Sequence, residues 1–276
     1  MAALQLDNIF CVIDPTTNNQ RALTRAVSVA RNADATIHAH LCFAMPAGMH
    51  VNDMESFREA ELTRQTLWLD AILQPHRDEG LKIESEVQCD DNWREALVNA
   101  AREVKAGLIV RSSYRHTTLQ RRVLKTTDWT LLRQAHCPVL LVKSDRVGKS
   151  EKVLVALNVM DKSKAHEKLT DNVIDHARTI VDRSGSELFA VNAYHGRENF
   201  VHPPDLAKRV GIDRNKAYVG EGAPEDVIAE QLKNWRIAAG GDRLLARKGV
   251  SELVVGDTAE RILDKINADV MVVMQR

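Results

Sequence analysis

The sequence has no excess of charge of either sign. Its 38 lysines and arginines balance 38 aspartates and glutamates, although charged residues make up 28% of the 276-residue chain. Overall charge therefore gives no support to a partner held by bulk electrostatic attraction, such as an anionic membrane surface or nucleic acid. We expect no membrane partner and argue against a nucleic-acid partner on the same ground.

Long apolar runs and paired cysteine motifs are missing as well. No stretch approaches the roughly 18 apolar residues of a membrane-spanning helix, and the opening residues lack the basic and apolar segments of a secretory signal. The four cysteines are scattered, without a C-x-x-C spacing, which is typical of reduced and buried thiols. These absences predict a soluble protein of the cytoplasm. The four are Cys11, Cys42, Cys89 and Cys137.

What the chain does contain is a long internal repeat. A short apolar strand that ends in a carboxylate, N-I-F-C-V-I-D (8–14), has a counterpart 144 residues later in K-V-L-V-A-L-N (152–158). Another apolar strand, C-P-V-L-L-V-K (137–143), has a counterpart 131 residues later in A-D-V-M-V-V-M (268–274). The period is far too long for a solenoid, so the chain is interpreted as two fused copies of one unit.

The second copy is the shorter one. The helix start D-D-N-W-R-E-A-L-V (90–98) corresponds to E-G-A-P-E-D-V-I-A (221–229), again 131 residues later. The offset falls from 144 to 131 between the first strand and this helix, so 13 residues are missing there from the second copy. We predict two domains, 1–146 and 147–276.

Strand and helix patterns alternate in both copies. Regular alternation with nearly continuous β-branched strands predicts an α/β fold, in which parallel sheets are covered by helices on both faces. Ligands of such sheets bind beyond the carboxyl ends of the strands, which places Asp14 and Asn158 at one rim. The first copy is expected to contain strands 9–14, 36–43, 82–87, 107–111 and 138–143 and helices 18–32, 53–79, 92–105 and 128–135.

The chain resembles a tandem-domain, E-type member of the universal stress protein family. The resemblance rests on I-D and L-N at the ends of the first strands, on G-A-P-E-D-V-I (222–228) at a helix start, and on G-D-T-A-E-R-I-L (256–263) before the last strand. It implies two doubly wound domains, each a five-stranded parallel sheet of order 3-2-1-4-5, packed as an internal pseudo-dimer through strands 138–143 and 270–274. It also implies a stress-induced, mostly regulatory and non-enzymatic cytoplasmic protein, and it leaves a further homodimer open.

In nucleotide-binding members of this family, the resemblance implies a glycine-rich loop around the phosphates of ATP and a first-strand aspartate that holds the adenine. The loop has the form Gly-x-x-Gly, nine residues, then Gly-Ser/Thr. In the second copy Gly256 is the final glycine, while Arg243 and Ala246 occupy the first two glycine positions and Asn158 replaces the aspartate. The stretch 234–246 also lacks the Val/Ile/Leu run of a central strand, either through divergence or through an abnormal reading of the segment.

The first copy keeps Asp14 but has Ser112, Arg115 and Lys125 at the three glycine positions. Side chains at these positions hold the backbone amides away from phosphate, and positive φ becomes costly. The sequence therefore predicts degenerate ATP sites in both copies, with ATP kept as a candidate cofactor. The resulting ligand-binding candidates are Asp14, Leu41, Asn158, Ala193, Gly249, Gly256, Asp257 and Thr258, and the anion-binding candidates are Arg111, Arg115 and Lys125.

Two interpretations of the segment around Gly256 stay open. Asp257 and Glu260 have the spacing of a capping box, which needs no ligand. Gly256 and the amides that follow it could instead retain an anion site at a helix N-terminus. An apolar stripe at helical spacing supports a helix here in either case. The stripe consists of Ala259, Ile262, Leu263 and Ile266.

Metal and catalytic sites have little support. His38, His40 and Cys42 alternate along one strand and share a face, but no fourth ligand cluster accompanies them, so we predict no metal. No nucleophile or phosphate-loop motif is present, so we predict no enzyme. The basic segment 111–125 could be a local anion site, a docking patch or a solvated loop.

Three functions remain. The chain is interpreted first as a non-catalytic stress-response regulator that binds a small ligand or a protein partner. The second is an ATP-binding protein with weak hydrolysis. The third is an RNA-associated or scaffold protein that uses the basic segment.

Overall fold

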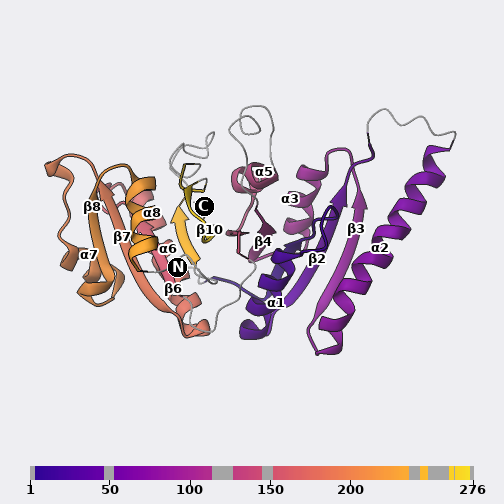
Figure 1. The fold of residues 1–276 in the computed structure, drawn as a ribbon, viewed down its shortest axis with the longest axis horizontal. Coiled ribbons are helices and arrows are strands. Elements are labelled where there is room, and N and C mark those ends of the chain that lie inside the picture. Colours follow the sequence, from indigo (N-terminus) through magenta and orange to yellow (C-terminus); the bar gives the residue numbers. More distant parts are fainter. Residues whose placement is uncertain are drawn as a thin grey trace.

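Ten strands form one twisted sheet across the computed structural model (Figure 1), which describes residues 4–46, 53–113, 127–144, 152–235, 243–247, 261–263 and 265–273. The strands are β1 (Asn8–Val12), β2 (Thr36–Phe43), β3 (Ile83–Cys89), β4 (Leu108–Ser112), β5 (Val139–Val142), β6 (Lys152–Leu157), β7 (Glu187–Tyr194), β8 (Ala217–Glu221), β9 (Arg243–Arg247) and β10 (Asp269–Val273). The helices are α1 (Arg21–Ala33), α2 (Met54–Asp78), α3 (Trp93–Glu103), α5 (Thr127–Gln134), α6 (Lys164–Ser184), α7 (Pro203–Val210) and α8 (Pro224–Asn234), with 3-10 turns at Arg197–Asn199 and Arg214–Lys216.

The strand order is β3-β2-β1-β4-β5-β10-β9-β6-β7-β8. Read from its outer edge toward the middle, each half has the order 3-2-1-4-5, and the neighbouring strands within each half are parallel. The halves join where β5 and β10 pair antiparallel, with Leu140 opposite Met271. The predicted fold class and the predicted pairing of these two strands are therefore confirmed.

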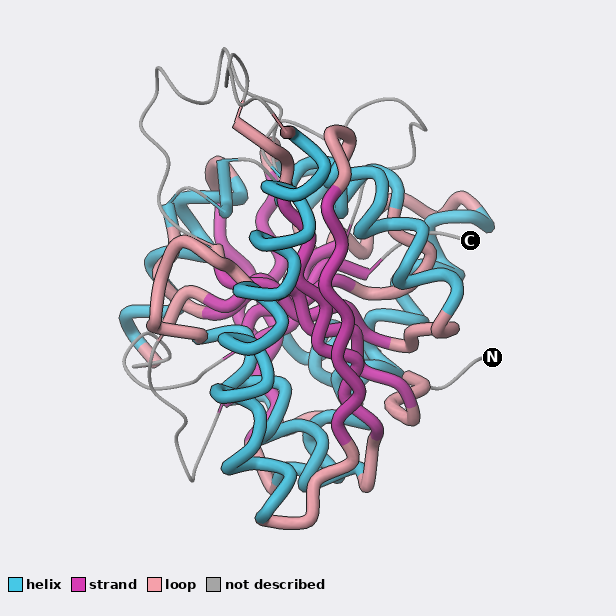
Figure 2. The backbone as a smooth tube through the Cα atoms, turned by 90° about the vertical axis from the view of Figure 1, so that its right-hand side faces the viewer, coloured by secondary structure: helices cyan, strands magenta, loops and turns pink. Residues whose placement is uncertain are grey.

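Hydrophobic cores lie on both faces of the sheet, with the sheet running between layers of helices (Figure 2). One core packs side chains of α1, α2, α6 and α7 against the strands, and the other packs α3, α5 and α8. The four residues of β5, V-L-L-V, are all fully buried, because a strand inside a doubly covered sheet exposes neither face. Within the described ranges, none of the helices combines the length and apolar character that crossing a membrane requires.

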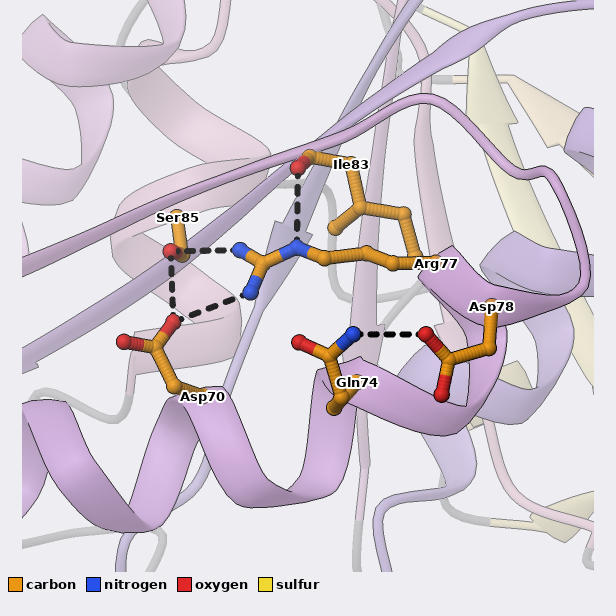
Figure 3. Close-up of polar contacts among 6 residues, drawn as sticks. All are labelled: Asp70, Gln74, Arg77, Asp78, Ile83 and Ser85. Carbon is orange, nitrogen blue, oxygen red and sulfur yellow. Dashed lines mark hydrogen bonds and ion pairs between the residues drawn. The ribbon is translucent and has the colours of Figure 1, made fainter.

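The long helix α2 closes the outer edge of the first half. Asp53 caps it by accepting a hydrogen bond from the Ser56 amide at 2.9 Å. Near its other end, the Arg77 guanidinium joins the helix to edge strand β3 (Figure 3). It contacts Asp70 Oδ1 at 3.0 Å, donates to Ser85 Oγ at 2.8 Å and donates to the backbone carbonyl of Ile83 at 3.2 Å.

The corresponding place in the second half holds only the eight-residue helix α7. Two prolines in its first turn suit a helix start, and Gly211 ends it in the left-handed conformation with φ of 76°. The second copy is therefore shorter here, in the region where the repeat offsets place its missing residues. The boundary at 146/147 lies outside the described residues and stays a prediction.

One expectation about the second half is wrong. The family motif places Arg243 and Ala246 at the first two glycine positions of a phosphate loop, and the stretch 234–246 lacks the Val/Ile/Leu run of a central strand. Instead Arg243–Arg247 form β9, which pairs with both β6 and β10. A central position must satisfy hydrogen bonds on two sides, and R-L-L-A-R supplies that strand despite its flanking charges.

Candidate functional site

The loops beyond the carboxyl ends of β1 and β4 form the rim of the first half. Asp14 uses its side chain to build its own turn, since Oδ1 accepts from the Thr16 amide at 2.9 Å and from the Thr16 hydroxyl at 2.6 Å. The Gln20 amide nitrogen donates to the backbone carbonyls of Asp14 and Thr17, both at 2.6 Å. The predicted ligand residue Asp14 therefore lies at the rim within a tightly bonded loop.

Ser112, the last residue of β4, contacts the backbone at the start of α1. Its hydroxyl oxygen accepts a hydrogen bond from the Ala22 amide at 3.0 Å, and the residue is buried. Gln20, at the N-cap position, makes no side-chain capping bond, so Ser112 takes over the capping role from a strand 90 residues away. An anion could use this amide only by displacing Ser112.

A buried carboxylate already neutralises Arg111. Asp128, in the first turn of α5, accepts from Arg111 Nε at 2.8 Å and from the Ser113 hydroxyl at 2.6 Å. The Arg111 and Asp128 side chains are 16% and 9% exposed. Arg111 is thus an internal ion-pair partner, and the helix start that could attract an anion carries a negative charge of its own.

Arg94 is a rim cation that sequence reasoning missed. Its guanidinium lies 4.4 Å from the centre of the Trp93 ring, and its buried Nε has no hydrogen-bond partner within the part of the chain described. Burial and the nearby charge of Arg111 lower the pKa of Arg94. Its place in the helix start D-D-N-W-R-E was the available signal, but spacing alone does not show which way the side chain turns.

A hollow of about 820 Å³ opens beside this rim, between the ends of β2 and β3 and the start of α2. Arg58 crosses it to donate to the Cys89 carbonyl at 2.7 Å. Thioether, aliphatic and carboxylate side chains share its lining, so it offers both apolar and polar contacts to a small molecule. Its lining includes Met45, Met54, Glu55, Leu62, Asp90 and Asp91.

In the second half, Asn158 also forms its own turn. Its side-chain oxygen accepts from the Met160 amide at 3.1 Å, and its backbone carbonyl accepts from His166 Nε2 at 2.7 Å. His166 Nδ1 lies 2.9 Å from an Asp161 oxygen. The two halves therefore place Asp14 and Asn158 equivalently, each accepting from the amide two residues on.

Asn192 is a further polar residue of this rim that sequence reasoning missed. It is fully buried in β7, and its oxygen accepts from the Val159 amide at 3.3 Å. Its amide nitrogen has no hydrogen-bond acceptor among the residues described. A buried donor without an acceptor is costly, which favours a water or ligand atom there. The signal was an asparagine inside the otherwise apolar run L-F-A-V-N-A.

The remaining candidates divide by position. Leu41 is fully buried in the core, whereas Ala193 is half-buried on β7 next to Asn192. Their roles stay predictions. Near the C-terminus, Ile262, Leu263 and Ile266 are buried, as the helical stripe predicts, while the choice between a cap and an anion site stays open. Six candidates lie outside the described residues, namely Arg115, Lys125, Gly249, Gly256, Asp257 and Thr258.

The histidines of β2 pair with carboxylates of β3. His38 Nδ1 lies 3.0 Å from Glu84 and its Nε2 lies 3.1 Å from the Asn8 side-chain oxygen, while His40 Nδ1 lies 3.5 Å from Glu86. Over the described ranges, no group of three or more histidine, cysteine or acidic side chains could hold a metal ion.

The cysteines are buried residues of the core. All four are free and buried. Burial, with smaller contributions from Asp90, Cys89 and Glu86, raises the pKa of Cys42 to about 12. Burial also raises the pKa of Cys11. A protonated thiol is a poor nucleophile, so these residues act as small apolar core groups.

Acid should destabilise the protein through two buried histidines. Burial lowers the pKa of His40 and of His176 below 6.5, and for His40 the nearby Glu86 and Glu103 offset only part of this effect. The unfolded chain therefore binds more protons, so the stabilisation is present above about pH 6.5 and is lost as the pH falls toward the lower folded-state pKa.

We expect His40→Gln to flatten the dependence of unfolding free energy on pH between about pH 6.5 and 5. One proton corresponds to at most about 1.4 kcal/mol per pH unit. Urea unfolding at several pH values measures this slope. His195→Gln, at an exposed histidine, is the matched control and should leave the slope unchanged. Equal slopes for the wild type and His40→Gln would contradict the prediction.

Comparison with known proteins adds a family to this geometry. A model described as the universal stress protein family matches residues 5–143. The chain is 24% identical to universal stress protein E of Escherichia coli K12, covering 96% of this chain and 93% of the relative. It is 21% identical to a universal stress protein E homolog of Haemophilus influenzae, covering 97% of each chain.

Two solved structures share the fold over nearly the whole chain. A functionally unknown protein from Pseudomonas aeruginosa PAO1 superimposes with a TM-score of 0.77 at 23% identity, covering 99% of this chain and 94% of that one. A structure from Archaeoglobus fulgidus gives a TM-score of 0.78 at 16% identity, covering 99% and 98%. At these identities the likeness concerns the fold.

Proposed function

Since the chain belongs to the universal stress protein family, we propose that it is a non-catalytic stress-response regulator of the cytoplasm. It binds a small ligand or a protein partner at its rims and does not hold ATP in a glycine-lined phosphate loop. The Asp128–Arg111–Ser113 cluster, together with Ser112 at the start of α1, is the observation that carries this proposal.

The cluster opposes a triphosphate for electrostatic reasons. A phosphate brought to the start of α5 would meet the buried Asp128 carboxylate, and a like charge in a poorly solvated place is strongly repulsive. Arg111 could help only by leaving Asp128, which would then remain buried without its ion-pair partner. The first half thus favours an uncharged or weakly anionic ligand, with Arg94 as a cation near Arg111.

The second half supports an uncharged polar ligand. Asn192 supplies a buried amide donor, and Ala193 follows it on the same strand. Hydrolysis has no support from the serines at the rim of the first half, because the Ser112 hydroxyl accepts from Ala22 and the Ser113 hydroxyl donates to Asp128. Neither serine has a histidine base in these contacts.

We expect no tight ATP binding and no significant ATP hydrolysis. Losing two or three charge-assisted contacts at about 1.5–3 kcal/mol each would weaken a micromolar site to millimolar or beyond. Calorimetry with Mg²⁺ and ATP at physiological salt, with an assay for released phosphate, tests this. A dissociation constant below about 10 μM would overturn the proposal in favour of an ATP-binding protein.

Asp128→Asn tests the physical reason separately. It keeps the size of the side chain, removes the negative charge and leaves Arg111 without its anion, so binding of ATP or inorganic phosphate should strengthen. If Asp128→Asn binds neither better than the wild type does, Asp128 does not exclude phosphate from this rim. Salt-dependent retention of RNA by the wild type would favour the scaffold interpretation instead.

A further inference from the structure

The middle of the seam between β5 and β10 does not by itself distinguish the two halves. Leu140 faces Met271, and these residues are separated by the 131-residue repeat offset, so the pairing is centred on equivalent positions. Both strands are apolar and buried. Two copies of β5, or two copies of β10, from separate chains could pair in the same antiparallel way.

One end of the seam is charged and fully buried. Arg25 of α1 lies 2.8 Å from an Asp269 oxygen of β10, and these side chains are 1% and 0% exposed. The other Asp269 oxygen accepts from the backbone amides of Lys143 at 2.9 Å and Ser144 at 3.1 Å. Asp269 of the second half is thus held by three groups of the first half.

The side chain of Lys143 crosses the seam in the same region. Its Nζ donates to the carbonyls of Leu263 and Ile266, the latter at 3.2 Å, just after the described helical residues 261–263 and 265 of the second half. A cation suits these carbonyls at the end of a helix. The Arg21 guanidinium donates to the Lys143 backbone carbonyl at 3.4 Å. We call Arg21, Arg25, Lys143 and Asp269 the seam cluster.

The equivalent positions at the other end of the seam are uncharged. The strand offset relates Lys143 to Met274 and Asp269 to Pro138. Helices α1 and α6 end in the same left-handed cap at Asp34 and Gly185, 151 residues apart, so Arg21 corresponds to Asn172 and Arg25 to His176. His176 is buried, as Arg25 is, and burial lowers its pKa, which keeps the imidazole uncharged at neutral pH. All four charges therefore gather on one side of the pseudo-twofold axis.

We infer that the seam cluster determines which halves pair. It favours pairing of a first half with a second half, and it disfavours pairing of two first halves or of two second halves. Pairing two first halves would bury two Arg25 side chains opposite Pro138. Pairing two second halves would bury two Asp269 carboxylates near the neutral His176 in place of a guanidinium. A buried charge without its partner is strongly unfavourable, whereas apolar replacement of a whole pair is often neutral, so selectivity explains the pair better than stability does.

Two complementary full-length variants test whether Arg25 and Asp269 determine which halves pair. Arg25→Asp places two carboxylates at the buried contact within a chain, and Asp269→Arg places two guanidinium groups there. When the two variants are refolded together, the first half of each matches the second half of the other. A reciprocal heterodimer then restores an Arg–Asp contact at both seams, and the paired variants compensate each other.

We expect a one-to-one heterodimer, seen by light scattering and native mass spectrometry, after co-refolding at about 100 μM. The short connection between halves gives an effective concentration of the order of millimolar, so the mismatch must weaken the intramolecular seam more than about tenfold. The wild type should be free of such exchange. Arg31→Glu and Glu79→Arg, which invert an exposed ion pair within the first half, are the control pair and should form no heterodimer.

Each other outcome overturns the inference. Variants that stay monomeric and as stable as the wild type, without a heterodimer in the mixture, would show that Arg25 and Asp269 do not select the partner. Variants that misfold separately and also misfold together would show that the pair serves folding of the whole chain and not the choice of a partner half.

Discussion

Leu140→Asp is expected to lower the free energy of unfolding by about 4 kcal/mol or more. Leu140 is fully buried in β5, between β4 and β10, and it faces Met271 across the seam. An aspartate there would lose the apolar burial of leucine and carry a carboxylate among the apolar side chains of the core. Urea unfolding followed by circular dichroism measures the change.

Leu67→Asp provides the matched control. Leu67 lies on the outer surface of α2 and is 67% exposed, so the same substitution should change the stability by no more than about 0.5 kcal/mol. If the two variants unfold alike, β5 does not lie in a buried seam. A larger loss at Leu140 with a retained monomer would show that the seam also supports the two halves within one chain.

Gly107→Ala is expected to cost about 3–6 kcal/mol. A Cβ at Gly107 would lie under 3.0 Å from the backbone oxygen of Gln5, and a backbone oxygen cannot turn aside as a side chain can. The amino-terminal segment would have to move, and with it the buried Leu4 and Leu6. Burial of each leucine contributes about 1.5–3 kcal/mol. Thermal unfolding measures the loss.

Gly185→Ala is the control, because it shows what replacing a glycine costs when the new Cβ meets no other atom. Gly185 ends α6 with φ of 67°, and a Cβ there would meet no atom within 4 Å. Its replacement should cost only the unfavourable backbone conformation, about 1–2 kcal/mol. The collision argument fails if Gly107→Ala is the milder of the two variants.

Local sequence patterns were sufficient for the order of the elements. Apolar runs such as V-L-L-V and the alternation of strand and helix predicted a parallel sheet covered by helices in each half, while the resemblance to the family implied the pairing of β5 with β10. The repeat offsets predicted that the second copy is the shorter one, and α7 is shorter than α2. These features depend on neighbours in the chain and on a repeat that can be read directly.

The same patterns were misleading at β9. R-L-L-A-R has too little β-branched character to indicate a central strand, yet its backbone bonds to both β6 and β10 place it there. A strand forms here because β6 and β10 both offer backbone hydrogen bonds to the segment between them. That arrangement is set by the tertiary structure. Local propensity is a weak guide where two neighbouring strands supply hydrogen bonds.

The sequence alone, through its resemblance to the family, predicts that the phosphate loops lack their glycines and that neither copy holds a standard ATP site. Only the tertiary structure decided which contacts the polar residues make. Ser112 caps α1, Arg111 pairs with Asp128, and Arg25 reaches Asp269 in the other half. The residues of these last two pairs are 17 and 244 positions apart, and a charge shows its partner only when the sheet has brought the two together.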